Sequence, residues 1–314
     1  MTSITILIPC YNEAKGIPAL AAALNAELPK IEKDLDVDLS LLFVDDGSKD
    51  NTVDVLKATD FDIPTRLIVL SRNFGKEAAL SAGLDAHWSD AVIMMDADLQ
   101  HPIALIPDMI RKWREGYDVV YAFKSSRDQE GLATRLLSKA FYRLVNYGSR
   151  TELPKNAGDY RLLDRRVVEA IGKLPEAQRF MKGLYAWVGF RQIGIPMTVA
   201  ERATGRTSFS PIRLLGLAVD GLTSFSIAPI RIMSIAGLLI ATLSFLYMAW
   251  IILQRLFFEA PFNGFASLAV LIAFFGGTTV LGLGVVGEYV AKALLEAKRR
   301  PIYVVADEIE LSDG

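Results

Sequence analysis

The sequence predicts an α/β domain built on an open, mostly parallel sheet, followed by a hairpin of two membrane-spanning helices. Short apolar runs alternate with helical patterns over about the first 125 residues, and two long uncharged segments lie near the C-terminus. The chain of 314 residues is 52% hydrophobic, with a mean hydropathy of +0.30. A soluble chain of this size usually has a lower mean hydropathy, so the apolar excess must be concentrated in particular segments.

Five short runs rich in Val, Ile and Leu define the predicted strands. Continuous apolar runs of this length are typical of buried parallel strands. Residues with helical spacing lie between the runs, which favours helices on both faces of the sheet. Ligands of such sheets bind beyond the carboxyl ends of the strands, so the residues after each run are the candidate site. The runs are Ile4–Ile8, Leu39–Val44, Arg66–Leu70, Ala91–Met95 and Asp118–Tyr121.

Charge and cysteine content exclude several function classes. The 34 basic and 36 acidic residues leave a net charge of -2, so no bulk positive field indicates nucleic acid as a partner. The one cysteine, Cys10, ends an apolar run and is interpreted as a buried thiol, which leaves no disulfide or thiol chemistry. The chain enters Ile4–Pro9 with no basic leader, so we expect the N-terminal domain, residues 1–209, in the cytoplasm.

The C-terminal third predicts a membrane hairpin. Residues 210–228 have amphipathic spacing, as in a helix at a membrane surface. Met233–Leu253 and Ala266–Gly287 are 21 and 22 residues without a charge, and about 20 such residues cross the hydrocarbon layer. Two buried core helices are the alternative. We expect the spans at residues 229–254 and 266–290, joined by an extracytoplasmic loop at 255–265.

Charges flanking the spans predict their orientation. Basic residues are concentrated before the first span and after the second, so both termini are expected in the cytoplasm. Gly277, Gly284 and Gly287 share one stripe of the second span, which favours close helix packing within or between subunits. The tail, residues 291–314, carries a predicted short strand at Pro301–Val305, which is expected to pair with a neighbouring subunit.

Carboxylates follow two of the predicted strands. Asp96 and Asp98 come after the fourth run, and residues i and i+2 of an extended segment project to one side. Two like charges held together need a cation, and oxygen ligands with open positions suit Mg²⁺ or Mn²⁺ bridging phosphates. Asp45-Asp46-Gly47-Ser48 follows the second run and forms either a polar pocket floor or a plain strand–turn–helix junction.

The segment Ser71–Glu77 after the third strand offers groups for a pyrophosphate. Arg72 and Lys76 could neutralise its charge, and Gly75 would allow close approach of the backbone. The segment lacks the upstream glycine and the hydroxyl residue of a Walker A loop. The two histidines, His87 and His101, have no metal-ligand spacing, and we expect them at surface or satisfied positions.

The order of these motifs resembles family 2 glycosyltransferases of the GT-A fold. The resemblance rests on Pro9–Glu13, Asp45–Ser48 and Asp96–Asp98. Four further motifs, together with the two C-terminal spans, resemble bactoprenol glucosyltransferases of the GtrB type. Dolichyl-phosphate mannose synthases and undecaprenyl-phosphate aminoarabinose transferases are related. The four motifs are Ser71–Lys76, Asp96–Pro102, Gly158-Asp159-Tyr160-Arg161 and Arg179-Phe180-Met181-Lys182-Gly183.

This resemblance implies roles for individual residues. Asp159 lies at the acceptor and is expected to be catalytic together with Asp98. Metal ligands are expected to be Asp96, Asp98 and Gln100. Nucleotide-binding residues are expected to be Pro9, Tyr11, Glu13, Asp45, Asp46, Arg72, Gly75, Lys76 and Asp96. The lipid phosphate is expected to be held by Arg127, Arg135, Arg202, Arg206 and Ser208, although a solvated or headgroup contact is the alternative for each arginine.

The implied reaction is an inverting transfer of a hexose, glucose from UDP-glucose, to undecaprenyl phosphate at the cytoplasmic face of the bacterial inner membrane. A phosphate monoester is mostly dianionic at pH 7, so no strong general base is required. Alternatives are a mannose synthase, an aminoarabinose transferase, a processive polysaccharide synthase or a non-catalytic membrane scaffold. The processive enzymes carry a Gln-x-x-Arg-Trp motif that this sequence lacks. The family also implies a homotetramer, membrane lipid as a partner, and a downstream flippase and second glycosyltransferase.

Overall fold

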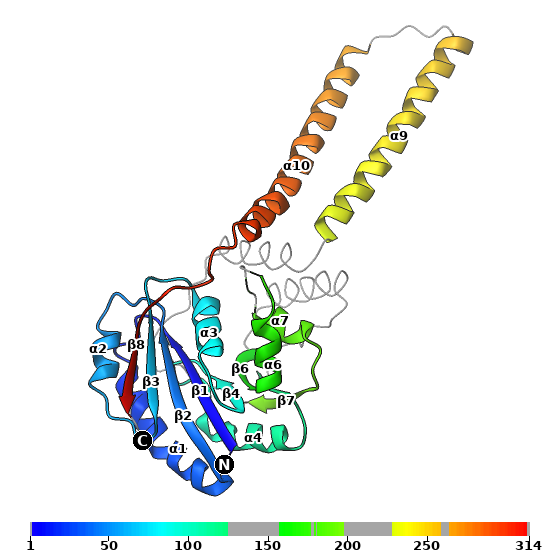
Figure 1. The fold of residues 1–314 in the computed structure, drawn as a ribbon. Helices are drawn as coiled ribbons and strands as arrows, with labels where there is room; N and C mark the ends of the chain where they lie inside the picture. Colours follow the sequence, from blue (N-terminus) through cyan, green and yellow to red (C-terminus); the bar gives the residue numbers. More distant parts are fainter. Residues whose placement is uncertain are drawn as a thin grey trace. The chain divides into compact units, whose positions relative to one another are not determined.

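A computed structural model describes residues 2–124, 157–176, 179, 181–197, 228–258 and 264–312. The chain divides into two compact units (Figure 1). Described residues up to 197 and residues 299–312 form the first unit, which contains the sheet. Residues 228–258 and 264–298 form the second, which is a pair of long helices.

The first unit is built on one mixed sheet of eight strands in the order β7-β5-β6-β4-β1-β2-β3-β8. The pairs β1–β2, β1–β4, β2–β3 and β5–β7 are parallel, whereas β4–β6, β5–β6 and β3–β8 are antiparallel. The carboxyl ends of β1 to β4 therefore meet at one edge. The strands are β1 Thr2–Cys10, β2 Val37–Asp45, β3 Thr65–Leu70, β4 Ala91–Met94, β5 Val119–Lys124, β6 Ala157–Asp164, β7 Gln192–Met197 and β8 Val305–Ser312.

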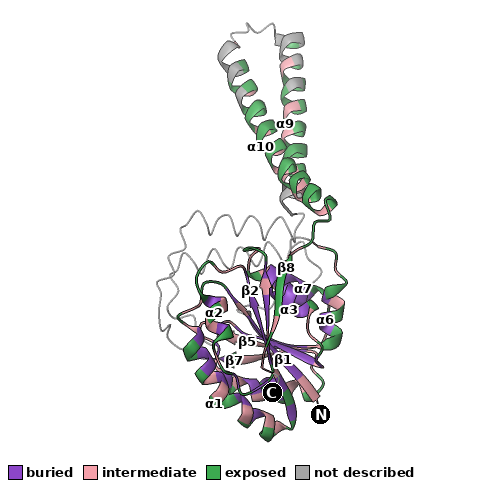
Figure 2. Ribbon diagram, turned by 60° about the vertical axis from the view of Figure 1, so that its left-hand side comes forward, coloured by how far each residue is buried: buried purple, intermediate pink, exposed green. Residues whose placement is uncertain are grey.

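Helices cover both faces of the sheet. Side chains alternate along β1, so the strand packs against one helix layer on each face. Ile4, Ile6 and Ile8 are buried in the core cluster that also holds the apolar face of α1. Leu7 points to the opposite face, where a Cβ on Gly83 of α3 would lie 2.1 Å from its Cδ1. Figure 2 shows the buried sheet between these layers. The helices are α1 Ile17–Leu35, α2 Thr52–Lys57, α3 Lys76–Asp85, η1 Ile103–Leu105, α4 Ile106–Arg114, α6 Arg165–Gly172 and α7 Met181–Trp187.

All five predicted strands are confirmed as β1 to β5, with small shifts at their ends. The sheet also contains β6, β7 and β8, which the sequence analysis did not place as they occur. The tail strand is a correction. It runs from Val305 to Ser312 rather than from Pro301 to Val305, and it pairs with β3 of the same chain rather than with another subunit.

The second unit consists of α9 (Ala228–Phe258) and α10 (Phe265–Ala297). Each contains a stretch long and apolar enough to cross a membrane, Met233–Ile251 and Val270–Ala297. Most described residues of the two helices are exposed (Figure 2), and Leu238, for example, is 70% exposed. Apolar surface on this scale normally faces lipid or another protein.

Among the residues that the structure describes, the glycine stripe of the second span has no packing partner within this hairpin. A Cβ on Gly277, Gly284 or Gly287 would meet none of the described side chains within 4 Å, whereas Gly282 lies against Met233. Packing of the stripe against another subunit stays a prediction. Of the expected amphipathic segment at 210–228, residues 210–227 lie outside the described residues, and residue 228 is the first residue of α9.

Candidate active site

A pocket of about 320 Å³ lies at the carboxyl ends of β1, β2 and β4. It brings together most of the residues that the sequence analysis assigned to the nucleotide and the metal. This is the edge at which open α/β sheets bind their ligands. The lining residues are Pro9, Cys10, Tyr11, Glu13, Asp46, Asn73, Gly75, Lys76, Ala79, Asp96, Ala97 and Asp98.

The loop after β1 is tied to the loop after β2. Asn12, with a φ of 57°, donates its backbone N–H to Ser48 Oγ at 2.8 Å, and its Oδ1 accepts from Lys49 N at 2.8 Å. Glu13 N donates to Thr52 Oγ1 at 2.9 Å. These bonds fix the wall of the pocket on which Tyr11 is 39% exposed.

Asp45 and Asp46 have different places. Asp45 is fully buried and accepts hydrogen bonds from the backbone N–H and the hydroxyl of Ser48, so it shapes the turn and does not line the pocket. Asp46 lines the pocket and accepts from Phe74 N at 2.7 Å and Gly75 N at 2.9 Å. The loop after β2 therefore holds the loop after β3.

Gly47 allows these two loops to touch. Its φ is +63°, and a Cβ there would lie 2.3 Å from the carbonyl carbon of Arg72. No other residue fits both the conformation and the contact. The Arg72 guanidinium lies 4.0 Å from the centre of the Phe74 ring and donates to Asn73 O, so it does not line the pocket.

Lys76 joins the two carboxylates assigned to metal binding and catalysis. Its Nζ lies 2.5 Å from Asp96 Oδ1 and 3.0 Å from Asp159 Oδ2. Burial lowers the pKa of Lys76, but Asp96 and Asp159 outweigh it, so the net pKa is raised and the ammonium stays charged. The pocket thus contains a permanent cation beside its carboxylates.

His101 is a satisfied, buried residue that supports Asp96. Its Nδ1 accepts from Asp96 N at 2.9 Å, and Nε2 lies 4.0 Å from Asp96 Oδ2. The ring stacks on Tyr160 at 4.6 Å, and Tyr160 donates to Pro102 O at 2.8 Å. Burial lowers the pKa of His101 by more than Asp96 and Asp98 raise it, so the ring is neutral. The acceptor role of Nδ1 requires the Nε2–H tautomer.

The carboxylates of the pocket fit a divalent cation. Burial raises the pKa of Glu13, and the charges of Asp98, Asp50 and Asp96 raise it further, so several carboxylates face Glu13. Gln100 Nε2 is buried without a hydrogen-bond partner among the described residues, so this N–H donor is available to a ligand oxygen such as that of a phosphate, whereas a cation would be held by the amide Oε1. No group of three His, Cys, Asp or Glu side chains in the described parts of the chain converges as a cage. Mg²⁺ and Mn²⁺ sites on nucleotides need only one or two carboxylates, because phosphates complete them.

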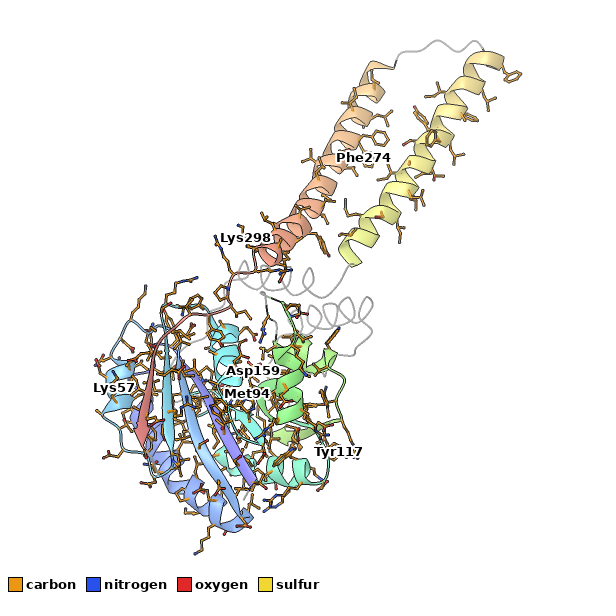
Figure 3. All side chains as sticks on the ribbon, in the orientation of Figure 1. Lys57, Met94, Tyr117, Asp159, Phe274 and Lys298 are labelled. Carbon is orange, nitrogen blue, oxygen red and sulfur yellow. The ribbon has the colours of Figure 1, made fainter. Side chains whose placement is uncertain are left out.

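Asp159 lies on β6 beside α3 (Figure 3) and faces two lysines. Lys182 Nζ is 3.8 Å from its Oδ1, opposite the contact with Lys76. Burial raises the pKa of Asp159, but Lys182 and Lys76 outweigh it and hold the pKa below its ordinary value. Asp159 is therefore an ionised carboxylate that lies between the ammonium groups of Lys76 and Lys182.

Supporting roles for Glu77, His101, Arg161 and Lys182 were not predicted from the sequence. Three of these residues lie within the motifs that carried the family resemblance, but a motif alone does not show which side chains meet. Five expected lipid-phosphate residues lie outside the described residues, so the structure does not place them. They are Arg127, Arg135, Arg202, Arg206 and Ser208.

Comparison with known proteins supports a single family. Residues 5–172 match the family described as Glycosyl transferase family 2. A bactoprenol glucosyl transferase of Shigella phage SfV is 40% identical over 306 residues, covering 97% of this chain and 98% of that protein. An uncharacterized glycosyltransferase of Synechocystis sp. is 41% identical over 305 residues, covering 97% and 95%. A Pyrobaculum calidifontis mannosyltransferase structure with GDP-Man and Mn²⁺ is 17% identical, with a TM-score of 0.48 over 89% of this chain and 86% of that one. From the family match and the full-length relatives, the chain belongs to glycosyl transferase family 2 and has the GT-A fold.

Proposed function

We propose that this glycosyltransferase transfers glucose from UDP-glucose to undecaprenyl phosphate, releasing UDP and inverting the anomeric carbon. The observation that carries the proposal is the extent of the similarity. A relative named bactoprenol glucosyl transferase matches 97% of the chain, so the match includes the two apolar helices as well as the sheet domain. A donor pocket alone would match family members with soluble acceptors equally well.

The pocket provides what a nucleotide diphosphate requires. Tyr11 offers a partly exposed ring for the base, and Lys76 offers an ammonium for the diphosphate. Asp96, Asp98 and Gln100 would hold the divalent cation, which when bound neutralises charge that develops on the departing UDP. Asp46 accepts a hydrogen bond from Gly75 N and so holds the loop after β3 in place. The backbone of this loop can then approach the phosphates.

Asp159 acts by positioning rather than by removing a proton. A phosphate monoester has a second pKa of about 6 and is already mostly dianionic at pH 7. The carboxylate of Asp159 has a lowered pKa and is held by Lys76 and Lys182, which makes it a weak base. It therefore orients the two lysines around the reacting groups, and the phosphate oxygen attacks directly.

The membrane placement belongs to the same proposal. A polyprenyl tail stays in the bilayer, so its phosphate can be reached only by an enzyme held at the surface. We infer that α9 and α10 span the bacterial inner membrane with the sheet domain and both termini in the cytoplasm. A homotetramer, and a flippase and second glycosyltransferase that use the lipid-linked sugar, complete the proposal.

The test is transfer of radiolabel from a panel of UDP- and GDP-sugars to undecaprenyl phosphate in detergent. We expect label in the organic phase from UDP-glucose with Mg²⁺ or Mn²⁺ and none with chelator. Label from a GDP-sugar or from UDP-aminoarabinose would instead favour the mannose synthase or the aminoarabinose transferase. Label from no donor, with protein that still binds UDP, would contradict the polyprenyl phosphate acceptor.

A further inference from the structure

The helix α7 packs against the sheet next to Asp159. The Arg161 guanidinium, two residues along β6 from Asp159, lies 3.9 Å from the centre of the Tyr185 ring. Tyr185 is 1% exposed, donates its hydroxyl to Met94 Sδ at 3.3 Å, and accepts from Gln192 Nε2 through its carbonyl at 2.9 Å. With three such contacts on one residue, α7 has little freedom to shift against β4 and β6.

The first residue of α7 is held by a hydrogen bond to α3. Glu77 Oε2, in the first turn of α3, accepts a hydrogen bond from Met181 N at 3.2 Å. Met181 is the first residue of α7, and the N–H groups of a first helical turn have no partner within the helix. A carboxyl oxygen satisfies such a group, since the oxygen that accepts the N–H remains an acceptor whether or not the carboxyl is protonated. The next residue of α7 is Lys182.

The first turn of α3 thus positions the two lysines that flank Asp159. Lys76 reaches Asp159 Oδ2 directly, at 3.0 Å. Glu77 sets the position of Lys182, whose Nζ lies 3.8 Å from Asp159 Oδ1. At that length the contact is an ion pair and not a hydrogen bond, so the N–H groups of Lys182 can serve another anion. The Lys182 side chain is 39% exposed, and Asp159 Oδ1 has no hydrogen-bond partner among the described residues.

We propose that Lys182 binds the phosphate of the lipid acceptor and that Glu77 is a positioning residue that holds Lys182 in place. This inference rests on the proposed function, since it needs a phosphate acceptor. Lys76 lines the donor pocket and Lys182 does not, so the two lysines that flank Asp159 divide between donor and acceptor. A lysine is suited to this role because it meets a dianionic phosphate as a point charge.

The first experiment measures steady-state kinetics of the full chain with undecaprenyl phosphate and UDP-glucose in detergent. For Lys182→Met we expect the KM for undecaprenyl phosphate to rise about 10- to 100-fold, the effect of a lost charge-assisted hydrogen bond. The KM for UDP-glucose and the Kd for UDP should stay within about twofold. Lys112→Met is the matched control, because Lys112 pairs with Glu115 on α4 and belongs to no site.

The second experiment separates positioning by Glu77 from a general effect on folding. Glu77→Ala should raise the acceptor KM as Lys182→Met does, and the double variant should be no worse than Lys182→Met alone. Glu77→Gln should restore a low acceptor KM, because its amide oxygen can accept from Met181 N. Independent effects that add, or no rescue by glutamine, would overturn the role of Glu77.

The outcomes also separate this inference from the proposed function. Wild-type transfer to undecaprenyl phosphate with an unchanged acceptor KM in both Lys182→Met and Lys182→Gln would overturn the role of Lys182 and leave the function intact. A raised KM for UDP-glucose instead would assign Lys182 to the donor. Absence of transfer by the wild-type protein would refute the proposed function itself.

Discussion

Replacing Asp46 by asparagine tests how the donor pocket is held together. Asp46 is 4% exposed, and each of its carboxylate oxygens accepts one backbone N–H, from Phe74 at 2.7 Å and from Gly75 at 2.9 Å. An asparagine keeps one accepting oxygen and turns its NH₂ group toward the other N–H. Asp46→Asn therefore loses one bond and leaves two donors facing each other in a buried place.

The magnitude follows from these contacts. A hydrogen bond to a charged group is worth about 1.5–3 kcal/mol, and a buried unsatisfied donor adds a penalty of similar size. Burial raises the pKa of Asp46 despite the two N–H bonds that lower it, so removing the charge returns part of the loss. We expect a net destabilisation of about 2 kcal/mol, or a fall in Tm of about 4–8 °C for a domain of this size.

The assay is thermal unfolding in detergent followed by tryptophan fluorescence, together with the Kd for UDP by calorimetry. The Kd should rise about 10-fold or more, because the loop that ends at Gly75 lines the pocket. Asp54→Asn is the control, because Asp54 is exposed on α2 and its replacement should change stability by less than about 0.5 kcal/mol. An unchanged Tm and Kd in Asp46→Asn would refute the reasoning.

Three further predictions follow from the same contacts. Gly83→Ala should cost about 1–3 kcal/mol of stability, seen as a lower Tm, because its Cβ would lie 2.1 Å from Leu7 Cδ1 in the core; an unchanged Tm would contradict this packing. His101→Ala should weaken Mn²⁺ binding about 10-fold in calorimetry with UDP present, because Asp96 N loses its acceptor; equal affinity would exclude a supporting role. Glu77→Gln should raise the Tm at pH 8 but not at pH 5. Burial, and then the charge of Asp159, raise the pKa of Glu77 from 4.5 to about 7, so the folded state holds the proton more tightly and the wild type loses stability as pH rises through that range. The same Tm difference at both pH values would contradict this.

The sequence predicted the parallel half of the sheet because those strands are buried on both faces. Strands β1 to β5 are continuous apolar runs, and such runs have few other interpretations. In contrast, β6 carries Asp159 and the buried Arg161. These polar residues belong to the site and interrupt the apolar run that would have predicted a strand. In β7, Gly194 and Pro196 are residue types that usually interrupt a strand, so the sequence pattern did not predict one there. A Cβ at Gly194 would lie 2.9 Å from the Tyr121 and Phe123 rings, and an edge strand tolerates Pro196.

The tail strand differs from its prediction because two patterns compete in this part of the sequence. Pro301–Val305 is a continuous apolar run, but β8 is an edge strand with one face buried. Ile309 and Leu311 pack against the core, whereas Glu308 and Glu310 are exposed, which is the alternation of a half-buried strand. That alternation was present in the sequence and would have located the strand.

The candidate site was predictable in its composition but not in its contacts. Residue type and position after a strand identified the carboxylates and Lys76. The burial of Asp45, the bonds from Asp46 to Gly75 and the link from Glu77 to α7 depend on loops that meet only in the folded chain. Such contacts join residues up to 104 positions apart, and no local pattern records them.

The most direct test of the central claim is the structure of the lipid product formed from UDP-glucose and undecaprenyl phosphate. Mass spectrometry gives its composition, and proton coupling at the anomeric carbon gives its configuration. We expect one hexose on one phosphate with a β linkage, the inverse of the α linkage in the donor, and UDP as the other product. A lipid diphosphate with release of UMP, or an α-linked sugar, would contradict single displacement by the lipid phosphate.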